Sequence, residues 1–117
     1  MSAAAAGAAG PTGVVTVEAG VCGHQATIRA QKTEGYNVRI EIETDCPHVQ
    51  KIAPEPIEAD AIRQIGLRGG LPSLLDASYA VCAHAACPVP SGIIKAVEVA
   101  AGLALPADVS MKISKEG

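Results

Sequence analysis

The stretch "HQATIRAQKTEGYNVRIEIET", residues 24–44, decides the fold, because apolar and polar side chains alternate on both sides of one short loop. Successive side chains of a strand point to opposite faces, so the apolar residues of both arms line one face of a sheet. These residues are Ala26, Ile28, Ala30, Val38, Ile40 and Ile42. The loop "KTEG" ends at Gly35, which can adopt positive φ. The two arms are therefore predicted to form a β-hairpin.

The segments on either side of this hairpin complete the predicted architecture. The β-branched stretch 13–20 predicts a strand before the hairpin, and "DVSMKIS" (108–114) alternates like a strand that returns to the sheet. Between them, proline and glycine bound four predicted helices. These cover residues 44–53, 57–66, 72–86 and 88–102. We expect an α+β fold of two layers, in which a three-stranded antiparallel β-meander is followed by helices and a C-terminal strand.

The length of 117 residues predicts a single domain with a thin core. Residues 1–12 are rich in alanine and glycine and are expected to form a disordered leader, which leaves residues 13–117 as one α+β domain. Aromatic residues make up 2% of the chain, so valine, isoleucine, leucine and alanine must build the core. A bound metal or a second copy of the chain would help such a core, and a homodimer is a reasonable expectation.

Composition argues against several classes of function. A net charge of −3, with no Trp, no Phe and two Tyr, provides neither the basic surface nor the stacking platform that nucleic acids need. Charged residues and proline interrupt the apolar C-terminal region, so no membrane span is expected. The opening residues lack the basic residues of a targeting segment. We expect a cytoplasmic protein, whose four cysteines are thiols or metal ligands rather than disulfides.

Each histidine of the chain stands two positions after a cysteine, which favours a metal site. The three pairs are Cys22 with His24, Cys46 with His48 and Cys82 with His84, and Cys87 is the remaining thiol. The intervals lack the paired Cys-x-x-Cys knuckles of a compact zinc site, so the ligands would have to converge through the fold. Cys46 and Cys87 each precede a proline at a predicted helix start, where the helix dipole favours a thiolate.

The other candidate ligands are weaker. Within one helix, residues 82 and 84 project about 200° apart, so Cys82 and His84 cannot both face one ion. Cys82 would then pack as a small apolar residue or serve as a fourth ligand. His24, at a turn, can lie beside Cys22 as a ligand or behind it as a hydrogen-bond donor. Asp45 or Thr44 is expected to cap the helix predicted within 44–53, with Pro47 at its first position.

Two segments, "VCGHQATIRAQKTEGYNVRIEIETDCPHVQKIA" (21–53) and "HAACPVPSGIIKAVEVAA" (84–101), resemble the NifU-like iron–sulfur cluster scaffold family. In that family a cysteine turn leads through two strands to a second cysteine at a helix start, and a third cysteine opens a later helix. The resemblance covers roughly residues 14–101 and implies that Cys22, Cys46 and Cys87 are cluster ligands. His24 stands where the family has aspartate. The chain is also similar to small uncharacterised single-domain proteins that contain cysteine.

The leading hypothesis is a small metal-binding protein that holds an iron–sulfur cluster or zinc through Cys22, Cys46 and Cys87, with Cys82 or His24 as a fourth ligand. It would act as a carrier, a scaffold-like protein or an accessory protein, with a metal or cluster donor or acceptor protein as partner. One alternative is a thiol-based enzyme that uses Cys87 at a helix N-terminus and a nearby histidine as base. Another is a structural or interaction domain with passive cysteines.

Overall fold

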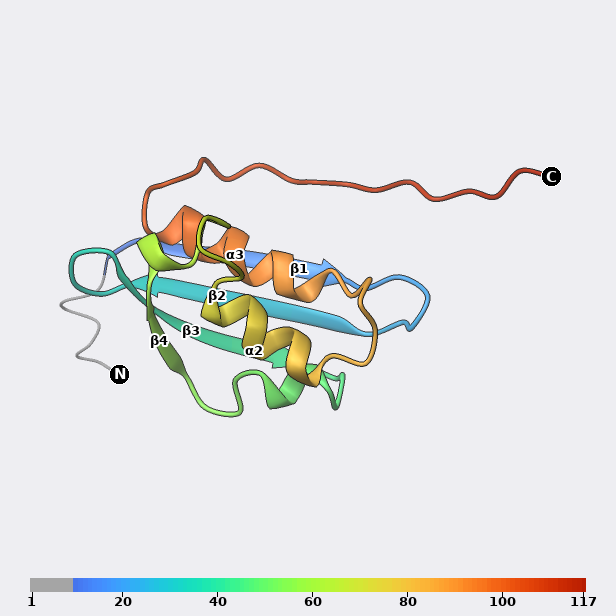
Figure 1. Cartoon of the computed structure of the whole chain (residues 1–117), viewed down its shortest axis with the longest axis horizontal. Helices are drawn as coiled ribbons and strands as arrows, with labels where there is room; N and C mark the ends of the chain where they lie inside the picture. Colours follow the sequence, from blue (N-terminus) through green and yellow to red (C-terminus); the bar gives the residue numbers. More distant parts are fainter. Residues whose placement is uncertain (1–9) are drawn as a thin grey trace.

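The computed structural model describes residues 10–117 and contains one antiparallel sheet with two helices on one of its faces (Figure 1). The strands are β1 (Thr12–Glu18), β2 (Gln25–Lys32), β3 (Asn37–Thr44) and β4 (Ile57–Asp60), in the order β1-β2-β3-β4. Helix α2 spans Ser73–Val81, helix α3 spans Val89–Ala100, and two 3₁₀ turns, η1 (Val49–Lys51) and η2 (Ala61–Arg63), lie on either side of β4. The α+β fold class is confirmed.

The predicted hairpin is β2 and β3, and its apolar face is the centre of the core. Ile28 pairs with Ile42 and Ala30 with Ile40, while Gly35 in the loop has φ 61°. Ile28, Ala30 and Ile40 are fully buried. The alternation therefore predicted both the pairing and the buried face, because a shift of one residue would have turned every apolar side chain toward solvent.

Helix α3 covers this face by a close approach of backbone to backbone. A Cβ added at Gly13 in β1 would collide with the carbonyl oxygen of Ala96, and one at Gly92 in α3 would lie 2.8 Å from Val17 Cγ2. Ile93 and Val97 on α3 are almost fully buried against the sheet. Gly13 on the strand and Gly92 on the helix thus let α3 pack tightly against the sheet.

Helix α2 packs beside α3. A backbone N–H in its first turn is hydrogen-bonded to a side chain from the loop after η2. The Leu74 N–H donates to Gln64 Oε1 at 2.9 Å, and Gln64 Nε2 donates to Ser73 Oγ at 3.0 Å. Gln64 is buried, so this contact fixes the loop after η2 to the start of α2. At Ser78 the buried hydroxyl donates to the Leu74 carbonyl at 2.6 Å.

The predicted helix at 57–66 is wrong, because residues 57–60 form the short strand β4. The Ile57 and Ala59 side chains alternate with Glu58 and Asp60, and this segment pairs antiparallel with the outer edge of β3. The Asp60 side chain then accepts the Ile62 N–H at 3.0 Å and starts η2. Backbone pairing with β3 prevails over the helical spacing, so the predicted three-stranded meander has a fourth strand.

Other predicted boundaries also change. The helix predicted at 44–53 is reduced to the single turn η1, because Pro47 and Pro54 restrict the chain around it. The helix predicted at 72–86 ends at Val81. The C-terminal strand predicted at 108–114 is wrong, since no strand forms after α3 and this segment is exposed.

Most of the predicted leader, residues 1–9, lies outside the described residues. Of the remainder, Gly10 donates its N–H to the Lys32 carbonyl at 2.7 Å, and Thr12 already belongs to β1. None of the helices formed by residues 10–117 has the length and apolar character needed to cross a membrane.

The close packing of α3 on β1 predicts that Gly13→Ala destabilises the protein. The added methyl group must push Ala96 away, so the free energy of unfolding should fall by about 1–3 kcal/mol. The matched control is Gly66→Ala, where an added Cβ meets no atom within 4 Å. It should leave stability unchanged or raise it by less than about 1 kcal/mol. Urea titrations followed by circular dichroism measure both, and equal losses in the two variants would contradict this packing.

Candidate functional site

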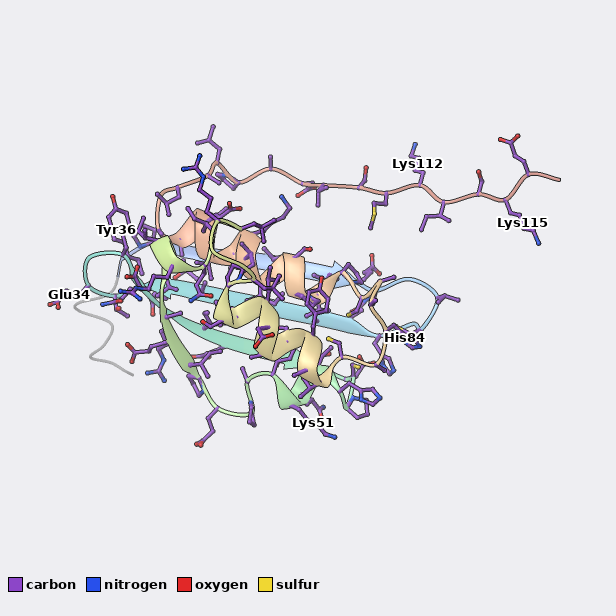
Figure 2. The ribbon with its side chains drawn as sticks, viewed as in Figure 1. Glu34, Tyr36, Lys51, His84, Lys112 and Lys115 are labelled. Atoms are coloured by element: carbon purple, nitrogen blue, oxygen red, sulfur yellow. The ribbon has the colours of Figure 1, made fainter. Side chains whose placement is uncertain are left out.

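One end of the sheet carries a pocket of about 430 Å³ that is lined by every cysteine and every histidine of the chain. These residues are Cys22, His24, Cys46, His48, Cys82, His84 and Cys87. The rest of the lining is apolar and small, and includes Val21, Val49 and Ala86. Figure 2 shows His84 at this end of the sheet, far from Tyr36 in the β2–β3 loop. We call this site the cysteine pocket.

The topology explains why these residues meet. In an antiparallel sheet the end of β1, the start of β2 and the end of β3 lie at the same end. Cys22 lies in the β1–β2 loop, whose glycines Gly20 and Gly23 have φ 93° and 76°. Cys46 follows β3 by two residues. The loop between α2 and α3 returns to this end and carries Cys82 and Cys87.

A hydrogen-bonded network fixes His24 and Cys46 to the neighbouring strands. Asp45 Oδ1 accepts the Gln25 N–H at 3.1 Å and lies 3.3 Å from His24 Nδ1. The Gln25 N–H, and after it the contact with His24, lowers the pKa of the Asp45 carboxyl. Thr44 Oγ1 donates to the Gln25 carbonyl at 2.6 Å and accepts the Cys46 N–H at 3.1 Å. The prediction that Asp45 caps a helix is therefore wrong, because its carboxylate joins β2 to the end of β3 and orients His24.

Three of the thiols interact with one another. Burial raises the pKa of the Cys82 thiol to about 11, and the neighbouring Cys87 and Cys46 thiols add to this increase. All three are partly buried and pack against the core, whereas Cys22 is exposed. The structure thus places Cys82 with Cys46 and Cys87, while Cys22 lines the same pocket from the β1–β2 loop.

This arrangement corrects one expectation about the α2–α3 loop and bears out another. Because α2 ends at Val81, Cys82 and His84 do not share a helix, and the argument that they project about 200° apart does not apply. Cys87 immediately precedes Pro88, the N-cap residue of α3, so it lies beside a helix start as expected. Its N–H donates to the His84 carbonyl at 3.2 Å in the loop. The contact between Cys82 and Cys87 was not predicted, although their separation by four residues around a helix break could have indicated it.

The donor types of the cysteine pocket suit a thiophilic ion, but their present positions do not form a coordination group. Across residues 10–117, no three His, Cys, Asp or Glu side chains are grouped so as to hold a metal ion. Thiolates and imidazoles are the ligands preferred by zinc, copper(I) and iron–sulfur clusters. Mutual repulsion among several thiolates favours their protonated forms, and a bound cation would reverse that preference. Metal binding therefore requires that side chains of the pocket turn toward a common point.

The electrostatics of the pocket predict slow, pH-dependent alkylation of Cys82. With a pKa of about 11, about one part in a thousand of this thiol is ionised at pH 8, against about a tenth for an ordinary thiol. Iodoacetamide should modify native Cys82 about 100-fold more slowly than the same residue in urea. The native rate should still rise through pH 10, after the unfolded rate has levelled off. Peptide mapping measures both rates, and similar native and unfolded pH profiles would contradict the raised pKa.

The comparisons with known proteins give a family without a function. A model of a family of unknown function (DUF6951) matches residues 14–113. No curated protein matches the chain, and neither does any solved structure. The resemblance to the NifU-like scaffold family is therefore wrong, because the order of turns and cysteines that suggested it belongs to a different family. Since the match covers most of the 117 residues, the chain belongs to the family of unknown function DUF6951.

Proposed function

We propose that the protein binds a thiophilic metal centre, an iron–sulfur cluster or a zinc ion, in the cysteine pocket. The observation that carries this proposal is that four cysteines and three histidines, from three separate segments of the chain, line one pocket of about 430 Å³. Cysteines that only fill a core would be expected at scattered apolar positions. Their collection with every imidazole of the chain is what a soft metal needs.

Cys46, Cys82 and Cys87 are the proposed principal ligands. They come from two segments and line the same pocket, and Cys87 and Cys46 both act electrostatically on the Cys82 thiol. Because a metal binds the thiolate, binding would release the thiol protons, and affinity would increase with pH. The burial that keeps Cys82 protonated would become favourable once a cation balanced the charge.

Cys22 or His24 is the proposed fourth ligand. Cys22 lies on an exposed loop, where Gly20 and Gly23 adopt positive φ angles that are unfavourable for other residues. His24 is held by Asp45, and a carboxylate partner of this kind orients an imidazole and increases its basicity as a ligand. Cys22 would enter the site by movement of its loop, whereas His24 would need only a change of side-chain angle.

The proposed role is to carry or hold the metal centre for a partner protein. Cys22 and His84 are exposed at the pocket, so a second protein could offer ligands there. A donor or an acceptor of the metal or cluster is the kind of partner that this geometry suits.

The proximity of the Cys82 and Cys87 thiols favours a second candidate function, dithiol–disulfide exchange with a low-molecular-weight disulfide. The Cys87 sulfur would attack one sulfur of the disulfide and release the first thiolate. Cys82 would lose its proton and attack the Cys87 sulfur, which closes the Cys82–Cys87 bond and releases the second thiol. Two protein thiols are oxidised, and one disulfide is reduced to two thiols. This is the form that the thiol-enzyme hypothesis takes in the observed geometry.

Anaerobic purification with iron, sulfide and zinc analysis, followed by titration of the metal-free protein with Co²⁺, tests the proposal. Thiolate-to-cobalt charge-transfer bands should appear and saturate at one equivalent per chain. Cys46→Ser, Cys82→Ser and Cys87→Ser should each weaken binding by about 100-fold or more, since loss of an outer-shell partner alone costs 10–100-fold. The matched control is Ala86→Ser, which changes the pocket lining without removing a donor.

A protein that contains no metal and gives no charge-transfer band with Co²⁺ would contradict metal binding. The same sample treated with glutathione disulfide then separates the second candidate from passive cysteines. Loss of two hydrogens, mapped to a Cys82–Cys87 link and prevented by Cys82→Ser, would support dithiol exchange. Four thiols that stay reduced would leave the cysteines with a packing role.

A further inference from the structure

Strand β1 is an uncovered edge of the sheet. In the sheet formed by the described residues, β1 pairs with β2 and has no neighbour on its other side. Its seven residues, "TGVVTVE", contain neither lysine nor proline, and the register with β2 is continuous from Thr12 to Glu18 without a bulge. Natural proteins shorten, charge, twist or cover such edges, because unpaired N–H and C=O groups recruit other strands. The opposite edge, β4, has four residues and is protected by its shortness.

The C-terminal tail, residues 103–117, contains a strand-like pattern that has no partner strand among residues 10–117. It leaves α3 after a turn at Gly102, where φ is 78°, and continues as an extended chain beyond the domain (Figure 1). Val109, Met111 and Ile113 alternate with polar residues, and they are 68%, 74% and 90% exposed. Figure 2 shows Lys112 and Lys115 on this tail, away from the sheet and the helices. An alternating strand pattern without a sheet is unexpected for a chain that stays alone.

The family model extends over most of the tail. The match to DUF6951 runs from Val14 in β1 to Ile113, the last apolar residue of the tail. A terminal segment without a structural role would not be expected to define the family together with the sheet. The alternating segment 108–114 has seven residues, the same number as β1.

We propose that residues 108–114 of one copy pair with the free edge of β1 in a second copy, so that two chains exchange tails in a homodimer. The apolar side of the tail would extend the sheet face that α3 covers. Val15 and Val17 of β1 are partly buried there, at the margin of the core. Val109, Met111 and Ile113 would cover that margin, and the polar residues of the tail would face solvent.

A second copy is the occupant that the observations favour. The tail's own domain leaves its apolar side chains exposed, and no strand formed by residues 10–117 pairs with the free edge of β1, so each chain presents both halves of the same interaction. Two identical chains satisfy both halves reciprocally, as a twofold interface requires. The proposal does not depend on metal binding, because the cysteine pocket lies in the loops beyond the end of β1 rather than along its free edge.

Light scattering coupled to size-exclusion chromatography of the full chain tests this dimer. The wild-type protein should have twice the mass of one chain at micromolar concentration. Met111→Lys places a charge on the apolar side of the tail and should raise the dissociation constant by at least about tenfold. The matched control is Ser110→Lys, which places the same charge on the polar side and should leave the dimer intact. Neither residue belongs to the core, so both variants should keep the wild-type circular dichroism spectrum.

Hydrogen exchange of the β1 amides provides a second measurement. Alternate amides of β1 should be protected in the wild-type dimer and should exchange faster in Met111→Lys. A monomeric wild-type protein would overturn the proposal, and so would a dimer that Met111→Lys leaves unchanged. Protection of the tail amides in a monomer would also overturn it, since the tail would then cover the β1 edge of its own chain.

Discussion

The close contact between α3 and the β1–β2 pair is the constraint on which the rest of the structure depends. Gly13 and Gly92 remove the side chains that would hold the helix and the strands apart. With almost no aromatic residues, the core has few large side chains, and it must gain its stability from small apolar residues at short distances. The path of α3 across the sheet then fixes where the α2–α3 loop, with Cys82 and Cys87, meets the end of β3.

The cysteine pocket follows from this geometry and from the antiparallel order of the strands. Each of its thiols lies in a connecting loop and not inside a strand or helix. In such loops, side chains can change orientation at a smaller cost than in the core. A rigid sheet with a cysteine-bearing rim is a suitable support for a site that must admit and release an ion. The partial burial of Cys82 makes its uncompensated thiolate unfavourable, and a bound cation would remove that penalty.

The sequence predicted the parts of the fold that depend on local periodicity. The hairpin of β2 and β3 and its buried face follow from the alternation of residues 24–44, because one face of that sheet is covered. The segment 57–60 was assigned to a helix, since four residues show too little periodicity to reveal that the edge of β3 would pair with them. The tail at 108–114 has the pattern of a strand, but pattern alone does not tell which sheet, or which chain, it joins.

For the site, the sequence indicated that the cysteines and histidines converge, but it did not reveal that Cys82 lies beside Cys87 and Cys46. The recurrence of histidine two positions after cysteine indicated a convergent site, and every one of these residues lines the cysteine pocket. The contact of Cys82 with Cys87 depends on α2 ending at Val81, which the apolar stretch after it concealed. The alignment of cysteines with a known scaffold family was misleading, because spacing between cysteines constrains loop lengths and leaves the family open.

X-ray absorption at the metal edge of the anaerobically purified protein tests the central claim most directly, because it reports which atoms surround the ion. Ligation by the thiols of the cysteine pocket predicts a dominant shell of sulfur at about 2.3 Å. This shell should lose amplitude in Cys87→Ser. A first shell made only of nitrogen and oxygen at about 2.0–2.2 Å, or protein isolated without any bound metal, would contradict the account.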